Sequence, residues 1–168
     1  MSDTTQEPYV LCHDLFSSCS LMVRLAIAVS KTAQQGHPVQ FVERQFDIQH
    51  KDEIDGFYMC KENPTSQVPA LIHPTLLVQP PTNSLDITFH LFDVYPNLCP
   101  PQFAEQIVTF LKKLHQINLS TLVFHNNPSA RERVYEASRR KLLDPAISAE
   151  LRGRLEKKLA AYVAPILL

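Results

Sequence analysis

The sequence predicts an α/β domain with a mixed sheet, followed by a small all-α segment. Three observations carry this prediction. Over the first 98 residues, short apolar segments typical of buried strands alternate with segments typical of helices. The double proline Pro100-Pro101 then interrupts the chain. Beyond it, apolar residues recur at helical spacing, and no further segment has the pattern of a strand.

The first part of the chain is predicted to follow the order β-α-β-α-β-β-α. Strands are expected at 9–12, 39–44, 67–72 and 75–78, and helices at 20–31, 51–60 and 83–95. Because only His73 and Pro74 separate the last two strands, we expect them to form an antiparallel hairpin. Asn83 or Thr82 can cap the last of these helices, and Asp86 in its first turn complements the helix dipole.

The second part of the chain is predicted to contain helices alone. Phe103, Ile107, Phe110, Leu114 and Ile117 mark one long amphipathic helix. A further helix is expected after HNNPS at 125–129, with Ser129 or Asn127 as its cap. It is interrupted at 144–148, and an apolar stripe continues through Ile147, Leu151, Leu155 and Leu159. We therefore place a first domain at 8–98 and a shortened helical domain at 101–168.

Composition argues against several classes of protein. The chain has 168 residues, 45% hydrophobic and 20% charged, with a formal net charge of −1. This balance is typical of a globular protein with a core, and it predicts no nucleic-acid or membrane partner. No signal peptide and no apolar segment long enough for a bilayer are recognised. The four cysteines form no CxxC pair, so we expect reduced thiols, a cytoplasmic location and no metal site.

The first predicted helix is preceded by an unusual polar stretch, Ser17-Ser18-Cys19-Ser20. Serine is a preferred N-cap residue, so the stretch can serve only to start the helix. A hydroxyl at a helix N-terminus also suits chemistry, because its hydrogen bond and the positive end of the helix dipole both stabilise a thiolate. The residues alone leave both interpretations open.

Three motifs in a fixed order carry a resemblance to a known family. They are SSCSLMVRLAI at 17–27, NPTSQVPAL at 63–71 and NSLDITFHL at 83–91. Together they resemble the N-terminal, thioredoxin-like domain of the glutathione S-transferase superfamily, and the first is similar to the zeta-like (maleylacetoacetate isomerase-like) motif. The resemblance covers roughly residues 9 to 98, whereas the remainder is similar only in its helical character.

The resemblance implies glutathione as cofactor and assigns roles to residues of the three motifs. Ser17 stands at the position of the catalytic serine, with Cys19 in a supporting role. Pro69 resembles a cis-proline that turns the backbone of Val68 towards glutathione; the alternative is a proline that merely starts an edge strand. The implied glutathione-binding residues are Ser17, Ser18, Cys19, Gln67, Val68, Pro69, Asn83 and Ser84.

The pair Asn83-Ser84 matches the Gln/Glu-Ser pair that holds the γ-glutamyl carboxylate in the family. Asparagine is shorter than glutamine and departs from that pattern. The alternative is that both residues only cap the helix. His50 and Lys51 are candidates for the glycyl carboxylate, although a solvated loop explains them better. Arg131, Arg133 and Arg139 are candidates for substrate carboxylates by residue type alone.

The implied activity is that of a glutathione-dependent transferase or isomerase. Ser17 would stabilise the glutathione thiolate, which adds to a hydrophobic small-molecule electrophile and gives conjugation or cis–trans isomerisation, in a secondary metabolism role. The resemblance also implies a homodimer. The shortened helical domain is a departure that would leave the acceptor pocket open on one side.

Two other classes of function are alternatives. One is a non-catalytic interaction module with the same fold. The other is a thiol oxidoreductase that works through Cys19; however, alignment on the Val23-Arg24 pair places the catalytic cysteine of redox-active relatives at Ser17 instead.

Overall fold

The computed structural model describes residues 7–32, 39–48, 54–117 and 127–163. The strands are β1 (Tyr9–His13), β2 (Phe41–Gln45) and β3 (Ala70–Ile72). The helices are α1 (Ser18–Thr32), α2 (Ser84–Val94), α3 (Ala104–His115), α5 (Pro128–Leu142) and α6 (Ala149–Val163). Shorter helical turns are η2 (Tyr58–Glu62), η3 (Pro96–Leu98) and η4 (Pro101–Phe103). The predicted residues His50 and Lys51 lie outside the described ranges.

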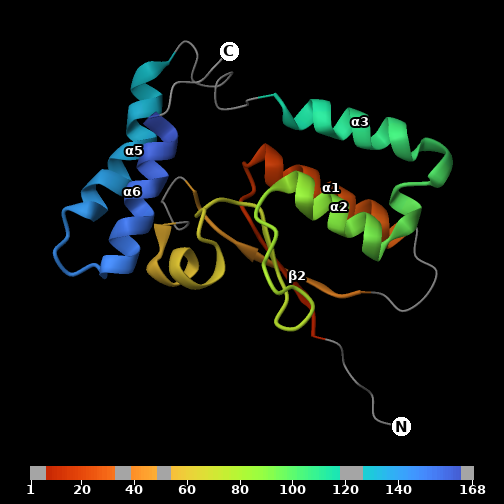
Figure 1. Ribbon diagram of the computed structural model, residues 1–168, viewed down its shortest axis with the longest axis horizontal. Helices are drawn as coiled ribbons and strands as arrows, with labels where there is room; N and C mark the ends of the chain where they lie inside the picture. The colour runs from red at the N-terminus through yellow and green to blue at the C-terminus, as the bar shows by residue number, and fades with distance from the viewer. Residues whose placement is uncertain (1–6, 33–38, 49–53, 118–126, 164–168) are drawn as a thin grey trace, which may run out of the picture.

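The three strands form one mixed sheet in the order β2-β1-β3 (Figure 1). β1 pairs with β2 in parallel, with Tyr9 opposite Phe41, and with β3 antiparallel, with Cys12 opposite Ala70. This arrangement confirms the predicted mixed sheet and the helices that follow it. One edge of the sheet therefore collects the ends of β1 and β2 and the start of β3.

The predicted fourth strand at 75–78 is wrong. The segment after β3 turns instead, because the Nδ1 atom of His73 accepts hydrogen bonds from the backbone N–H groups of Thr75, at 3.2 Å, and Leu76, at 3.0 Å. Of the apolar residues there only Leu77 packs against the core of the first face, whereas Leu76 is 50% and Val78 is 98% exposed. The backbone N–H of Leu71 in β3 is bonded to the carbonyl of Pro81 at 3.0 Å. The His73 side chain therefore accepts the backbone hydrogen bonds that a neighbouring strand would accept in a hairpin.

The two faces of the sheet are covered by different helices. On one face α1 and α2 pack side by side (Figure 1), and their core with β1 and β3 consists of Tyr9, Leu11, Val23, Ile27, Leu71, Ile87 and Leu91. On the other face Cys12, Phe46, Tyr58 and Ala70 form a second cluster. Because successive side chains of a strand point to opposite faces, the neighbours Leu11 and Cys12 belong to different cores.

A third cluster joins α6 to the second face. It consists of Ile54, Met59, Leu151 and Leu155. α5 and α6 pack together, and the ammonium of Lys141 on α5 donates to the carbonyl of Ile54 at 2.7 Å. The predicted interruption at 144–148 is confirmed, since α6 restarts with the hydroxyl of Ser148 accepting from the backbone N–H of Leu151 at 3.1 Å. The stripe predicted at Leu151 and Leu155 is thus buried against η2.

Two predicted apolar helix faces are less buried than the sequence indicates. α1 buries Val23 and Ile27 but exposes Leu21 and Leu25, so it is not enclosed on most sides as its composition predicts. α3 confirms the predicted long helix, yet none of its residues is buried. α3 packs mainly against α2 and η4, and Phe110 on it is exposed. No described helix is long and apolar enough to span a membrane.

Replacing Leu11 by alanine should destabilise the protein strongly. Leu11 is fully buried between β1 and the two helices, and removing such a side chain leaves a cavity that typically costs about 2–5 kcal/mol. Leu143→Ala is the matched control, because Leu143 is 83% exposed and surface changes stay within about 0.5 kcal/mol. Chemical denaturation followed by circular dichroism measures both free energies of unfolding; equal values would contradict the described core.

Candidate functional site

The predicted site residues gather at the sheet edge where β1 ends and β3 begins. The strand register places the residue after His13 opposite the segment just before Ala70. α1 starts at this edge, and Figure 1 shows that α2 begins on the same side and that the chain of α3 ends there. Two helix N-termini therefore lie near the end of one short sheet, where their dipoles favour a negatively charged ligand.

The loop between β1 and α1 is held by Asp14, which is 2% exposed. Its carboxylate accepts from the backbone N–H of Phe16 at 2.7 Å and from that of Ile48 at 3.2 Å. The backbone N–H of Asp14 donates to the hydroxyl of Ser20 at 3.3 Å. Asp14 thus fixes the entry to α1 and ties it to the segment after β2. Sequence reasoning missed this residue, although aspartate two residues before a chain reversal is a known turn signal.

Ser17 is the N-cap of α1. Its hydroxyl oxygen accepts from the backbone N–H of Ser20 at 3.3 Å, and its carbonyl accepts from the N–H of Leu21 at 2.9 Å. In the described part of the chain no acceptor for the hydroxyl hydrogen is found, and the side chain is half-buried. The capping bond uses only a lone pair. Ser17 therefore keeps a hydrogen to donate to a ligand beside the helix terminus.

Ser18 and Cys19 occupy the first turn of α1, directly after the cap. Ser18 is exposed and Cys19 is half-buried with a free thiol. Both side chains are thus available at the same helix end as Ser17.

The segment before β3 is fixed by a buried network around Asn63. The Asn63 amide donates to the carbonyl of Gln67 at 2.7 Å and to the hydroxyl of Tyr58 at 3.0 Å. The Tyr58 hydroxyl donates in turn to the carbonyl of Gln67 at 2.6 Å, and burial raises the pKa of Tyr58. The Val68–Pro69 peptide bond is cis, as the sequence predicts. The backbone at Val68 is therefore presented from a rigid loop.

At the start of α2, Asn83 caps the helix as expected, but the Ser84 hydroxyl has a partner that the sequence analysis did not predict. Asn83 caps the helix by accepting from the backbone N–H of Asp86 at 2.9 Å, as predicted. Ser84 is 3% exposed, and its hydroxyl lies 2.9 Å from Nε2 of His115 at the end of α3. Sequence reasoning missed His115, because nothing in the local pattern of a helical histidine indicates a partner 31 residues earlier.

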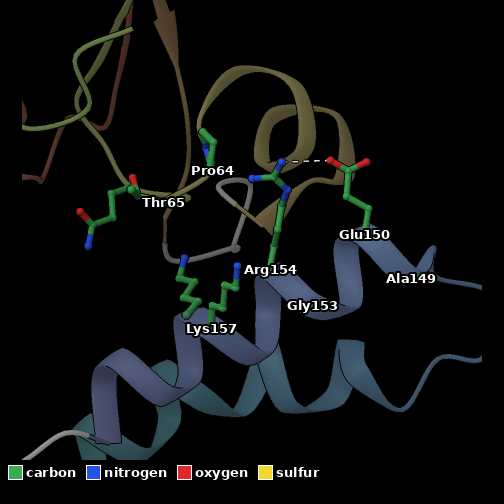
Figure 2. A pocket seen from close by; sticks show the side chains of 9 residues that line it. Pro64, Thr65, Ala149, Glu150, Gly153, Arg154 and Lys157 are labelled. Carbon is green, nitrogen blue, oxygen red and sulfur yellow. Dashed lines mark hydrogen bonds and ion pairs between the residues drawn. The ribbon is translucent and has the colours of Figure 1, made fainter. Parts of the chain in front are cut away.

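A pocket of about 700 Å³ opens between the loop 64–67 and α6 (Figure 2). Three cations line it: Arg154, Lys157 and Lys158. Glu150 supplies one carboxylate, which pairs with Arg154 at 3.0 Å. The pocket is therefore basic and suits an anionic group.

Two contacts connect this pocket to the predicted site. The ammonium of Lys158 donates to the carbonyl of Ser66 at 2.7 Å and to its hydroxyl at 2.9 Å, which fastens α6 to the loop. The Gln67 residue lines the same pocket. The predicted glutathione-binding segment thus borders a basic cavity that the sequence analysis did not anticipate, because α6 follows this loop by about 80 residues.

On the second face of the sheet a separate polar cluster surrounds Cys12. The guanidinium of Arg44 donates to the Cys12 sulfur at 3.0 Å and to the carboxylate of Glu62 at 3.0 Å. Burial raises the pKa of Cys12 to about 11, although Arg44 opposes the shift. This thiol is consequently protonated near neutral pH, and the cluster is a packing feature. Within the described ranges no group of three side chains able to hold a metal ion occurs.

The comparisons with known proteins show the fold. The sequence matches no protein-family profile and no curated protein. Among solved structures, the chain is similar to glutathione transferase Omega 2C from Trametes versicolor, with 20% identity and a TM-score of 0.52 over 96% of this chain and 63% of that chain. It is also similar to a glutathione S-transferase from the Antarctic clam Laternula elliptica, with 18% identity and a TM-score of 0.47 over 93% and 63%.

The similarity to the Trametes structure confirms the predicted fold class: a thioredoxin-like first part with a mixed sheet, followed by helices. The chain spans 63% of the length of each solved structure. The Trametes protein is of the Omega class by name, so the zeta-like subtype still rests on the first sequence motif alone.

The cysteines of the two faces should differ sharply in reactivity. Cys12 is buried with a raised pKa, so its thiolate fraction at pH 8 is about one in a thousand, whereas Cys19 is half-buried at the end of a helix. We expect iodoacetamide at pH 8 to alkylate Cys19 at least about tenfold faster than Cys12. Peptide mass spectrometry measures both rates, and unfolding in guanidinium should equalise them. Comparable rates in the folded protein would contradict the burial of Cys12.

Proposed function

We propose that this protein is a glutathione-dependent transferase or isomerase that uses Ser17 to activate the glutathione thiol. The observation that carries the proposal is the geometry of Ser17, which caps α1 through its oxygen and retains its hydrogen. A thiolate beside this hydroxyl would accept that hydrogen and lie near the positive end of the helix dipole. The fold shared with the Trametes glutathione transferase supports the choice of glutathione as ligand.

The free energy needed to lower the pKa of the glutathione thiol is modest. A free thiol has a pKa of about 8.5, so glutathione at neutral pH is mostly unreactive. A hundredfold gain in thiolate takes about 2.7 kcal/mol. One charge-assisted hydrogen bond supplies about 1.5–3 kcal/mol, and a helix terminus adds about 0.3–1 kcal/mol. Ser17 and α1 together are therefore sufficient, with Cys19 in a supporting role in the same turn.

The remainder of the tripeptide has three proposed contacts. The backbone of Val68 pairs with the cysteinyl residue in the manner of an added strand. The N-terminus of α2, with Asn83 and Ser84, receives the γ-glutamyl carboxylate. The basic pocket beside Gln67 receives the glycyl carboxylate through Lys157, whose ammonium lines it. This last contact replaces the role considered for His50 and Lys51.

The acceptor is a hydrophobic electrophile. Leu15 and Phe16 immediately precede Ser17, and Phe16 is 81% exposed, which provides apolar surface beside the thiolate. The thiolate sulfur forms a bond to an electrophilic carbon of a conjugated system, and the electron pair moves into the conjugated system. Protonation gives the conjugate. Rotation of the adduct followed by loss of the thiolate gives the cis–trans isomer.

The zeta-like motif favours an enzyme capable of isomerisation, and the unusual, shortened helical domain would fit a role in secondary metabolism. We also propose a division at Pro100-Pro101 into domains at 8–98 and 101–168, a homodimer and a cytoplasmic location. The homodimer follows from the family resemblance, the boundary from the double proline and the change of sequence pattern, and the location from the unpaired cysteines.

Ser17→Ala should remove both roles of the serine. Loss of the cap should lower the free energy of unfolding by about 1 kcal/mol, and the pKa of bound glutathione should return to its solution value. The ultraviolet absorbance of the thiolate, followed over a pH titration of the complex, measures that pKa. An unshifted thiol in the unaltered protein would make Ser17 mainly a cap, and the non-catalytic module would then be the better proposal.

Ser17→Asp separates the two roles. Aspartate is as good an N-cap as serine, so stability should be retained. Its carboxylate cannot donate a hydrogen bond and repels a thiolate, so the thiolate signal should be lost. A Ser17→Asp protein that still lowers the thiol pKa would contradict the donor role.

Lys157→Gln should weaken binding of glutathione but not of glutathione amide, in which a carboxamide replaces the glycyl carboxylate. For an exposed ion pair we expect a loss of about two- to fivefold in affinity, measured by calorimetry. Arg140→Gln is the control, because it removes an equally positive charge on α5 that pairs with Glu136 away from the pocket. If both variants, or neither, discriminate the two ligands, Lys157 does not hold that carboxylate.

A further inference from the structure

We propose that His115 is a positioning residue for glutathione: its protonation state decides whether Ser84 can donate a hydrogen bond to the γ-glutamyl carboxylate. The proposal rests on the function proposed above. It adds a residue from α3 to that site, and it predicts that affinity for the glutathione backbone increases as His115 takes up a proton.

The hydrogen bonds of His115 define its neutral form. Nδ1 lies 2.9 Å from the carbonyl oxygen of Leu111, one turn earlier in α3. A carbonyl only accepts, so Nδ1 carries the hydrogen. In neutral imidazole Nε2 is then the acceptor, and the Ser84 hydroxyl 2.9 Å away must donate to it. In this state Ser84 offers a ligand lone pairs alone, which repel a carboxylate.

Protonation reverses the polarity of this contact. When Nε2 also carries a hydrogen, it donates to the Ser84 oxygen, and the serine hydrogen is released for another acceptor. Because Ser84 is 3% exposed, little water competes to orient the hydroxyl. The imidazolium also places a positive charge close to the proposed carboxylate, separated from it by the Ser84 hydroxyl alone. Both effects favour the anion, so carboxylate binding and proton uptake are linked.

Within the described ranges the charged groups around His115 are few, so the protonation state of its own ring decides the direction of the hydrogen bond to Ser84. The main packing partners of α3 are α2 and η4. On α2 the nearest charged residue in sequence to Ser84 is Asp86, whose carboxylate contacts the Asn83 amide. η4 carries no titratable side chain, and on α3 itself Lys112 and Lys113 share the last turn with His115. Among the residues that the structure describes, no carboxylate lies within ion-pair distance of this imidazole.

The Ser84 backbone is held independently of this switch. Its carbonyl accepts from the Thr88 hydroxyl at 2.7 Å, and the preceding Asn83 caps the helix. Protonation of His115 therefore needs to move only the serine hydrogen, and the helix terminus stays in place. Histidine is the side chain most often used for a switch of this kind, because its surroundings decide whether it carries a proton at physiological pH.

S-methylglutathione is the appropriate probe, because its sulfur does not titrate and the γ-glutamyl carboxylate remains. We expect its dissociation constant to rise with pH, by up to about tenfold per pH unit, as His115 loses its proton. Calorimetry in buffers of different ionisation enthalpy should show uptake of protons on binding. The pH range is about 5.5 to 8, where both ligand carboxylates stay charged.

Three variants identify the residue responsible. His115→Gln and Ser84→Ala should each abolish the pH dependence and the proton uptake, the first by removing the titrating group and the second by removing the hydroxyl that it orients. His90→Gln is the control, since His90 also lies on a helix but contacts the hydroxyl of Tyr9 at 3.3 Å; it should keep the full dependence. Circular dichroism and thermal unfolding establish that each variant is folded.

The outcomes separate this inference from the function on which it rests. Binding of S-methylglutathione that strengthens with proton uptake, and loses this property in both site variants, supports the role of His115. Binding that is independent of pH in the unaltered protein overturns the role of His115 and leaves the proposed function standing. A dependence that survives in His115→Gln also overturns it. Absence of binding to glutathione and S-methylglutathione alike at every pH overturns the proposed function as well.

Discussion

The architecture depends on one constraint: where the chain leaves a short strand, its buried backbone N–H and C=O groups must still find hydrogen-bond partners. Asp14 solves this problem after β1. Its buried carboxylate accepts from the backbone of Phe16 and Ile48, and its own N–H is bonded to the hydroxyl of Ser20. An unpartnered buried polar group costs about 1–3 kcal/mol, so these bonds determine the path of the loop. That path in turn places Ser17 at the N-terminus of α1.

The same constraint is met at other turns by buried polar side chains. Asn63 with Tyr58 holds the carbonyl of Gln67 before β3, and the ring of His73 accepts two backbone hydrogen bonds after it. Strands of three to five residues provide few ladder bonds, and side chains therefore supply much of the order at their ends. The proposed glutathione contacts lie on these rigid turns, where a ligand meets groups that are already oriented.

Helices from distant parts of the chain complete the site from two sides. α3 brings His115 to Ser84 at the start of α2, and α6 brings Lys158 to Ser66 and Lys157 to the basic pocket. In the proposed complex, the glycyl carboxylate is met by Lys157, whereas the γ-glutamyl carboxylate is met by Ser84 with His115 behind it. The thiol is met by the first part of the chain alone, and segments beyond residue 100 contribute to the recognition of the two charged ends.

The sequence by itself determined the local features: the three strands, the five α-helices of the described residues, the cap at Asn83, the cis bond before Pro69 and the fold class were all predictable. Each depends on residues close together in the chain, through periodicity, capping and a short motif. The helix expected at 51–60 is found instead, within the described residues, as the short turn η2 at Tyr58–Glu62. The false strand at 75–78 arose because Leu76 and Val78 match a strand pattern, whereas a histidine turn competes for the same backbone. Only the tertiary structure decided that Ser84 meets His115, that Lys157 borders the loop at Gln67 and that α1 leaves Leu25 exposed. Those contacts join segments far apart in sequence, and their geometry is set by packing that no local pattern encodes.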